Sequence, residues 1–140
     1  MLPRFATWAM ALLLGTALLA PMRRAAAQAF VVVVNEAGPS SLSKNDVARI
    51  FLKTSDALMP VDQVRDSKVR PAFSRFVLGR SVSAVLTYWQ QQIFSGGGSP
   101  PPVKGSDAEV LASVRGNPKA IGYVSADAVL GAGVKLVAIQ

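Results

Sequence analysis

Apolar runs of the kind that form β-strands alternate along this chain with segments whose spacing suits helices. The run at residues 30–34 is unbroken and rich in β-branched side chains, which is typical of a strand buried on both faces. Further strands are expected at 59–64, 121–124 and 134–139, with Pro60 at the start of the first, where a missing N–H does least harm. Strands separated by helices predict an α/β layered domain with a small, mixed sheet flanked by helices.

Four segments combine helical apolar spacing with a preceding hydroxyl residue that can accept a hydrogen bond from the first turn. The loop at 95–102, between the third and fourth helices, is rich in glycine and then in proline, which predicts a flexible and then stiff connector. The second helix should run through Leu78 and end at Gly79. Its expected apolar stripe consists of Val69, Phe73, Phe76 and Val77. The four expected caps are Ser43, Ser67, Ser81 or Ser83, and Ser106, the last with Glu109 at capping-box spacing.

Tyr88 and Trp89 lie in the third expected helix and have two interpretations. Neighbouring aromatic side chains can form a flat platform for a ligand. However, Trp89 shares helical spacing with Val85, Leu86 and Ile93, and such a face usually packs against the core. We therefore expect core packing here rather than a ligand site.

The first 29 residues have the pattern of a secretory signal peptide. Arg4 precedes an uncharged run over residues 5–20, and small residues then provide an A-x-A arrangement that allows cleavage after Ala27 or Ala29. The uncharged run is shorter than the roughly 20 residues of a membrane span, so an uncleaved anchor is the weaker alternative. We expect export to the periplasm, with a single domain at 30–140 and no stable membrane span after cleavage.

Composition narrows the function classes. Cysteine and histidine are absent, which excludes disulfide frameworks, thiolate nucleophiles, His-ligated metals and Ser-His-Asp triads. The net charge is +7, but three arginines within residues 1–29 carry part of it, so residues 30–140 have a net charge of only +4. Nucleic acids require a denser basic face than this. We expect no enzymatic activity, no cofactor, no metal and no nucleic-acid partner.

Ser41 and Lys44 match the S-x-x-K spacing of β-lactamase-type enzymes, in which a lysine assists a nucleophilic serine. The companion S-D-N and K-T-G motifs are missing, and a helix capped by Ser43 would leave Ser41 outside it. We therefore interpret the match as chance, and a Ser/Lys esterase remains a marginal alternative.

Several short motifs follow one another in a fixed order between residues 42 and 124. They are Leu42-x3-Asp46-x3-Ile50-Phe51-Leu52, Pro60-Val61, Ser67-x5-Phe73, Tyr88-Trp89, Ser106-Asp107-Ala108-Glu109-Val110 and Ala120-Ile121-Gly122-Tyr123-Val124. This order resembles the periplasmic phosphate-binding proteins of ABC transporters, over about residues 31–139. The resemblance covers one of that family's two lobes, so it implies a single lobe of a type II periplasmic-binding-protein fold.

The resemblance also implies a site. The family's phosphate-binding loop, Arg-x-Asp-Gly-Ser-Gly-Thr, falls on residues 63–69, where Ser67 matches and Gln63 replaces the arginine. Independently, Arg65, Lys68 and Arg70 crowd an expected helix start, where positive side chains oppose the helix dipole unless an anion docks there. The candidate anion-binding residues are therefore Ser67, Lys68, Arg70, Arg65 and Gln63.

Two interpretations of the three cations remain open, since long basic side chains also occur as a solvated face with Asp66 partly offsetting them. The leading function is an exported, non-catalytic solute-binding-like protein associated with uptake of phosphate or another small oxyanion by an ABC transporter. The alternative is a degenerate binding-protein lobe that contacts another periplasmic protein.

Overall fold

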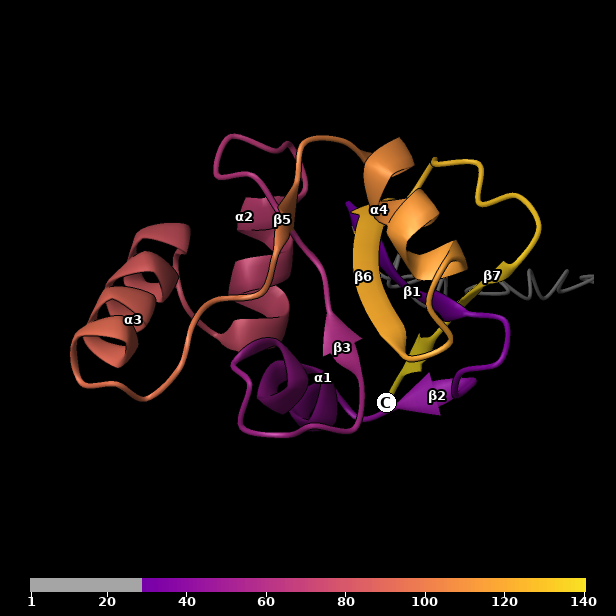
Figure 1. The fold of residues 1–140 in the computed structure, drawn as a ribbon. Helices are drawn as coiled ribbons and strands as arrows, with labels where there is room; N and C mark the ends of the chain where they lie inside the picture. The colour runs from indigo at the N-terminus through magenta and orange to yellow at the C-terminus, as the bar shows by residue number, and fades with distance from the viewer. Residues whose placement is uncertain (1–28) are drawn as a thin grey trace, which may run out of the picture.

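A computed structural model of the protein describes residues 29–140, so the expected signal peptide lies outside the described residues apart from Ala29. Four α-helices, a π-helical segment named η1 and eight short strands make up this part of the chain (Figure 1). In chain order they are β1 (Phe30–Asn35), β2 (Ser41–Leu42), α1 (Lys44–Phe51), β3 (Met59–Pro60), β4 (Asp62–Gln63), α2 (Arg70–Phe73), η1 (Ser74–Leu78), α3 (Val82–Phe94), β5 (Val103–Lys104), α4 (Asp107–Arg115), β6 (Ala120–Ser125), β7 (Val134–Leu136) and β8 (Ala138–Ile139).

The main sheet is mixed, as predicted. Its strand order is β3-β6-β1-β7, with β3 parallel to β6 and the other two pairs antiparallel. Within it, Val34 pairs with Ile121 and Val31 with Val124, so the two predicted core strands lie side by side. Two small parallel pairs, β2 with β8 and β4 with β5, form separate two-stranded sheets.

Both faces of the sheet are covered. Successive side chains of a strand point to opposite faces, so the side chains of β1 alternate between two separate cores. On one face, Val32 and Val34 join an aromatic cluster against α1, α2 and η1. On the other face, Val33 packs under α4. Gly122 allows the close approach of α4, since a Cβ at this position would lie 2.6 Å from Val110 Cγ1.

Packed aromatic rings fill much of the core on the first face of the sheet. Phe73 stacks on Tyr123 with ring centroids 3.8 Å apart and ring planes 7° from parallel. Phe51 contacts both of these rings, and Phe30 approaches both edge-on. Stacked and edge-on pairs of aromatic rings stabilise a core beyond their buried area.

Three of the predicted caps are confirmed. Ser43, Ser81 and Ser106 each accept a hydrogen bond from the backbone N–H three residues on, so they cap α1, α3 and α4. At Ser106 the capping box is shifted, because the Glu109 carboxylate accepts from Gly105 N–H rather than from its own cap residue.

The second helix differs from its prediction. It begins at Arg70 instead of directly after Ser67, and its second half is the wider π-helical η1, which ends at Gly79 with a φ of 65° as expected. The wider turn changes the side-chain angle, so Phe76 is 43% exposed while Val77 is buried. The strand predicted at 59–64 is divided between two sheets, and the strand at 134–139 is likewise divided in two.

The helix α3 stands apart from the sheet, at the left of Figure 1. Val85 and Trp89 are its only buried residues, so Trp89 packs within the protein as expected, although neither residue belongs to the two core clusters that flank the main sheet. Ile93 was expected on the same face, but it is 57% exposed. None of the helices within 29–140 has the length and apolar character that crossing a membrane requires.

Candidate functional site

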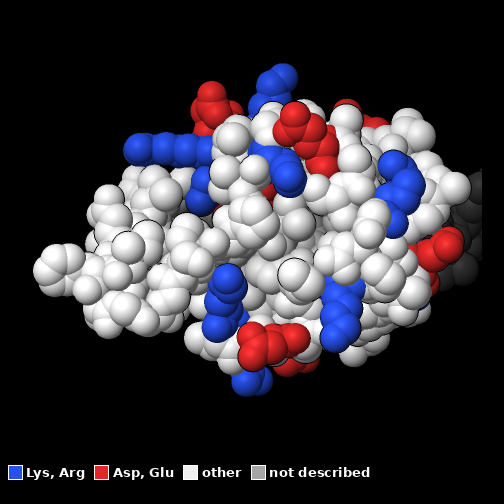
Figure 2. All heavy atoms as spheres, viewed as in Figure 1, with Lys and Arg blue, Asp and Glu red and all other residues white. Residues whose placement is uncertain are grey.

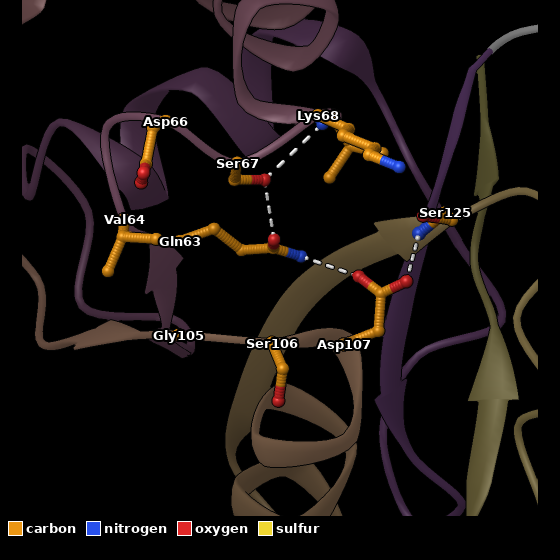
Figure 3. Close-up of a pocket in the computed structure, with 10 residues that line it drawn as sticks. Gln63, Val64, Asp66, Ser67, Lys68, Gly105, Ser106, Asp107 and Ser125 are labelled. Atoms are coloured by element: carbon orange, nitrogen blue, oxygen red, sulfur yellow. Dashed lines mark hydrogen bonds between the residues drawn. The ribbon is translucent and has the colours of Figure 1, made fainter.

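A pocket of about 320 Å³ lies between the loop that follows β4 and the first turn of α4 (Figure 3). The parallel pairing of β4 with β5 brings these two segments together, because Val64 N–H donates to Lys104 C=O. Most lining groups are small or polar. They are Gln63, Val64, Asp66, Ser67, Lys68, Val69, Gly105, Ser106, Asp107 and Ser125.

Gln63 is 3% exposed and bridges three parts of the fold. Its Nε2 donates to Asp107 Oδ1 at 2.9 Å and to the Tyr123 carbonyl at 2.8 Å, which ties β4 to α4 and β6. Its Oε1 accepts from the Ser67 hydroxyl at 2.6 Å. The side chain of Gln63 therefore holds the pocket in shape from behind, with its amide already hydrogen-bonded within the protein.

Ser67 is oriented by these neighbours. Its hydroxyl proton goes to Gln63 Oε1, and its oxygen accepts from Val69 N–H at 3.3 Å, just ahead of α2. It thus makes a local turn instead of capping a helix directly. In this arrangement the hydroxyl donates to an anion only after it releases Gln63.

Asp107, the first residue of α4, places a carboxylate in the pocket. Its Oδ1 accepts from Gln63, and its Oδ2 accepts from Ser125 N–H at 3.2 Å (Figure 3). A carboxylate at the start of a helix is stabilised by the helix dipole. The Asp107 carboxylate thus occupies the helix start, which is the position where the helix dipole would stabilise a bound anion most strongly.

Arg70 lies behind the pocket instead of lining it. Its Nη2 is 3.5 Å from Asp62 Oδ2, with both side chains under 10% exposed, and its Nη1 donates to the Gln63 carbonyl at 2.9 Å. Tyr123 donates its hydroxyl to the other oxygen of Asp62. Burial, followed by the Asp62 carboxylate, raises the pKa of the Tyr123 phenol far above its ordinary value of 10.0, so Tyr123 stays a donor.

The predicted site residues therefore occupy different positions. Gln63, Ser67 and Lys68 line the pocket, whereas Arg65 is exposed outside it and Arg70 is committed to the buried ion pair. Among the ten lining residues, Lys68 supplies the positive charge and two carboxylates oppose it. Across 29–140, no three His, Cys, Asp or Glu side chains gather closely enough to hold a metal ion.

Sequence reasoning did not assign Ser106, Asp107 or Ser125 to the site. The capping pattern at Ser106 predicted a helix start, but nothing in it indicated which loop would face that start. The S-x-x-K match does not form a pair, since Ser41 belongs to β2 and the Lys44 ammonium lies over the Phe76 ring, 5.3 Å from its centroid.

No protein-family model and no curated protein matches this sequence. Among solved structures, the chain is similar to an ABC-type phosphate transport receptor from Vibrio cholerae, with a TM-score of 0.59, 21% identity, and coverage of 78% of this chain and 45% of the receptor. It is also similar to a candidate phosphate ABC transporter substrate-binding protein from Clostridium perfringens, solved with bound phosphate, with a TM-score of 0.60, 18% identity, and coverage of 79% and 44%. A candidate phosphate-binding protein from Planctomyces limnophilus has a TM-score of 0.56 and 13% identity, and the match covers 80% of this chain and 41% of that one.

The chain spans less than half the length of these structures, an extent that agrees with a single lobe. The likeness confirms the predicted α/β class and the predicted resemblance at the level of the fold. This chain therefore shares its fold with just under half of a phosphate ABC-transporter substrate-binding protein.

Proposed function

We propose that this chain is an exported, non-catalytic solute-binding-like protein that holds phosphate or another small oxyanion in the pocket beside Ser67 and Lys68. Its role would lie in uptake by an ABC transporter. The observation that carries the proposal is the position of this pocket, next to the first turn of α4 in a fold shared with phosphate transport receptors. Export rests on the signal-peptide pattern of residues 1–29, which supports a periplasmic location.

Binding should be weak, because the pocket encloses an ion from one side only. Charge contacts that remain hydrated are worth about 1 kcal/mol each, so a few of them with a helix start give roughly 4–5 kcal/mol, or millimolar to sub-millimolar affinity. The carboxylates of Asp66 and Asp107 reduce this further. Such a lobe suits transient capture or a role beside a second chain better than tight storage of the ion.

The test is a titration of the purified protein with inorganic phosphate at low salt, followed by NMR shifts of the backbone amides. We expect saturation near the millimolar range, with the largest shifts at Ser67, Lys68 and Gly105, and a marked loss of affinity in physiological salt. Lys68→Gln should weaken binding several-fold. Arg65→Gln is the matched control, since it removes the same charge from the same exposed loop but lies outside the pocket.

Equal losses in the two variants would mean that only net charge matters, which contradicts a site at Lys68. Absence of any shift at about 10 mM phosphate would refute the oxyanion function. A salt-insensitive, sub-micromolar affinity would refute the one-sided pocket.

A protein-interaction module is the second candidate, and the surface of α3 favours it. No charged residue occurs from 81 to 103, and Figure 2 shows the protruding part of the molecule at the left without acidic or basic side chains on that face. At its end, Phe94 is 96% exposed and Ile93 57% exposed. An uncharged projection with exposed apolar side chains is typical of a contact surface for a similarly uncharged protein partner.

For this candidate, we expect the immobilised protein to capture a defined partner from an envelope extract and Phe94→Ser to lose at least ten-fold of that capture. Val129→Ser is the matched control, because Val129 is 89% exposed but lies in the loop between β6 and β7, away from α3. Capture that survives Phe94→Ser would exclude α3 as the contact.

A further inference from the structure

A second hollow, separate from the pocket beside Ser67, lies between the loop after α1 and the proline-rich segment before β5. Its volume is about 420 Å³, and it shares no lining residue with the first pocket. Its walls are largely apolar, which the first pocket's are not. The apolar lining residues that matter here are Leu58, Met59, Pro60, Pro101, Pro102 and Ala120.

Backbone hydrogen bonds hold these walls in place. Met59 N–H donates to Lys119 C=O at 2.8 Å, and Asp62 N–H donates to Pro102 C=O at 2.9 Å. The first bond anchors β3 beside β6, and the second anchors the proline-rich segment beside β4. The hollow is therefore preformed, as small-molecule sites usually are, and the rigid prolines reduce the cost of ordering it.

Lys53 at the rim has an unusual backbone. Helix α1 ends in a Schellman arrangement, in which Lys53 N–H donates to Ile50 C=O and Thr54 N–H donates to Arg49 C=O. The residue at this position must adopt the left-handed region, and Lys53 has a φ of 56° where glycine is the usual choice. Lysine is strained in this conformation relative to glycine.

Lys53 and Lys104 both line the hollow. Within residues 29–140, Asp56 is the one acidic residue that lines it. The lining thus combines apolar walls with a net single positive charge. We propose that this hollow binds a small monocarboxylate with an apolar body, whose hydrocarbon part contacts the walls and whose carboxylate faces the two lysines. A compact, multiply charged oxyanion would leave the apolar walls unused, so the two pockets should differ in ligand class.

The experiment compares octanoate, 1-octanol and octylamine as probes of the same chain length and different charge, each titrated into the purified protein. We expect octanoate to shift the amide signals of Leu58, Lys104 and Ala120, with an affinity at least five-fold above octanol and with octylamine not binding. Lys104→Gln should reduce octanoate affinity about three- to ten-fold. Lys135→Gln, on β7 outside the hollow, should leave it unchanged.

Lys53→Gly provides the most diagnostic variant, because its two effects should have opposite signs. Glycine relieves the left-handed strain, so the unfolding midpoint should rise by about 2–5 °C. Octanoate affinity should nevertheless fall three- to ten-fold because the ammonium is lost. Octylamine binding as well as octanoate, unchanged affinity in both lysine variants, shifts centred on Ser67, or no shift at all would each overturn the proposal.

Discussion

Replacing Arg70, the basic first residue of α2, with methionine is expected to lower the free energy of unfolding by about 3–5 kcal/mol. Arg70 is 6% exposed, and its guanidinium is the cation 3.5 Å from the buried Asp62 carboxylate. Methionine fills similar space but leaves that carboxylate without its counter-ion, and it also removes the donor to the Gln63 carbonyl. Urea unfolding followed by circular dichroism measures the loss.

Two further variants make this result specific. Arg75→Met removes an exposed arginine from η1 and should change stability by less than about 0.5 kcal/mol. Combining Arg70→Met with Asp62→Asn should cost less than the sum of the two single changes, because the stranded charge is then gone. A loss under about 1 kcal/mol for Arg70→Met would mean that the arginine is solvated and free to meet an anion.

Replacing Ile121 with alanine is expected to cost about 2–5 kcal/mol of stability. Ile121 is fully buried in β6, pairs with Val34 of β1, and belongs to the core that contains the aromatic cluster. Flanking rings stacked on one another cannot collapse into the space of the lost atoms, so a cavity should remain. The same urea titration measures this change.

The matched control is Val129→Ala, since Val129 is an apolar residue that is 89% exposed. It should be neutral within about 0.5 kcal/mol. An equally small effect of Ile121→Ala would place that strand at the surface and contradict the sheet order. Because small domains are stable by only about 5–15 kcal/mol, the Ile121 variant also tests how far the fold tolerates loss.

Local patterns predicted most of the secondary structure. The β-branched run at 30–34 favours burial on both faces, and it forms β1, one of the two inner strands of the main sheet. The caps at Ser43, Ser81 and Ser106 act within a single turn, so they can be predicted from a few neighbouring residues. Two predictions were wrong. Ser67 does not cap a helix, because its hydroxyl donates to Gln63, and Phe76 is not buried with the rest of its stripe, because the π-helical turn moves it outward.

The candidate site was predicted in part. Of the five residues named from the sequence, Gln63, Ser67 and Lys68 line the pocket, and their role in anion binding stays a prediction. Arg70 was expected to face an anion, but it is held away from the pocket by its ion pair with Asp62. Asp62 lies outside the group of charges at the helix start from which the prediction was made. Similarly, Asp107 reaches the pocket because β4 pairs with β5 across a long stretch of chain, and no local spacing encodes that contact.

The amino-acid sequence by itself therefore determined the alternation of strands and helices, three of the four expected helix caps, and the absence of histidine and cysteine chemistry. The tertiary structure decided which basic side chains are free, which carboxylate enters the pocket, and where the second, apolar hollow forms. The physical reason is the distance along the chain over which each interaction acts. Caps and apolar periodicity act over one or two turns, whereas a buried ion pair or a pocket wall depends on desolvation by segments distant in the chain.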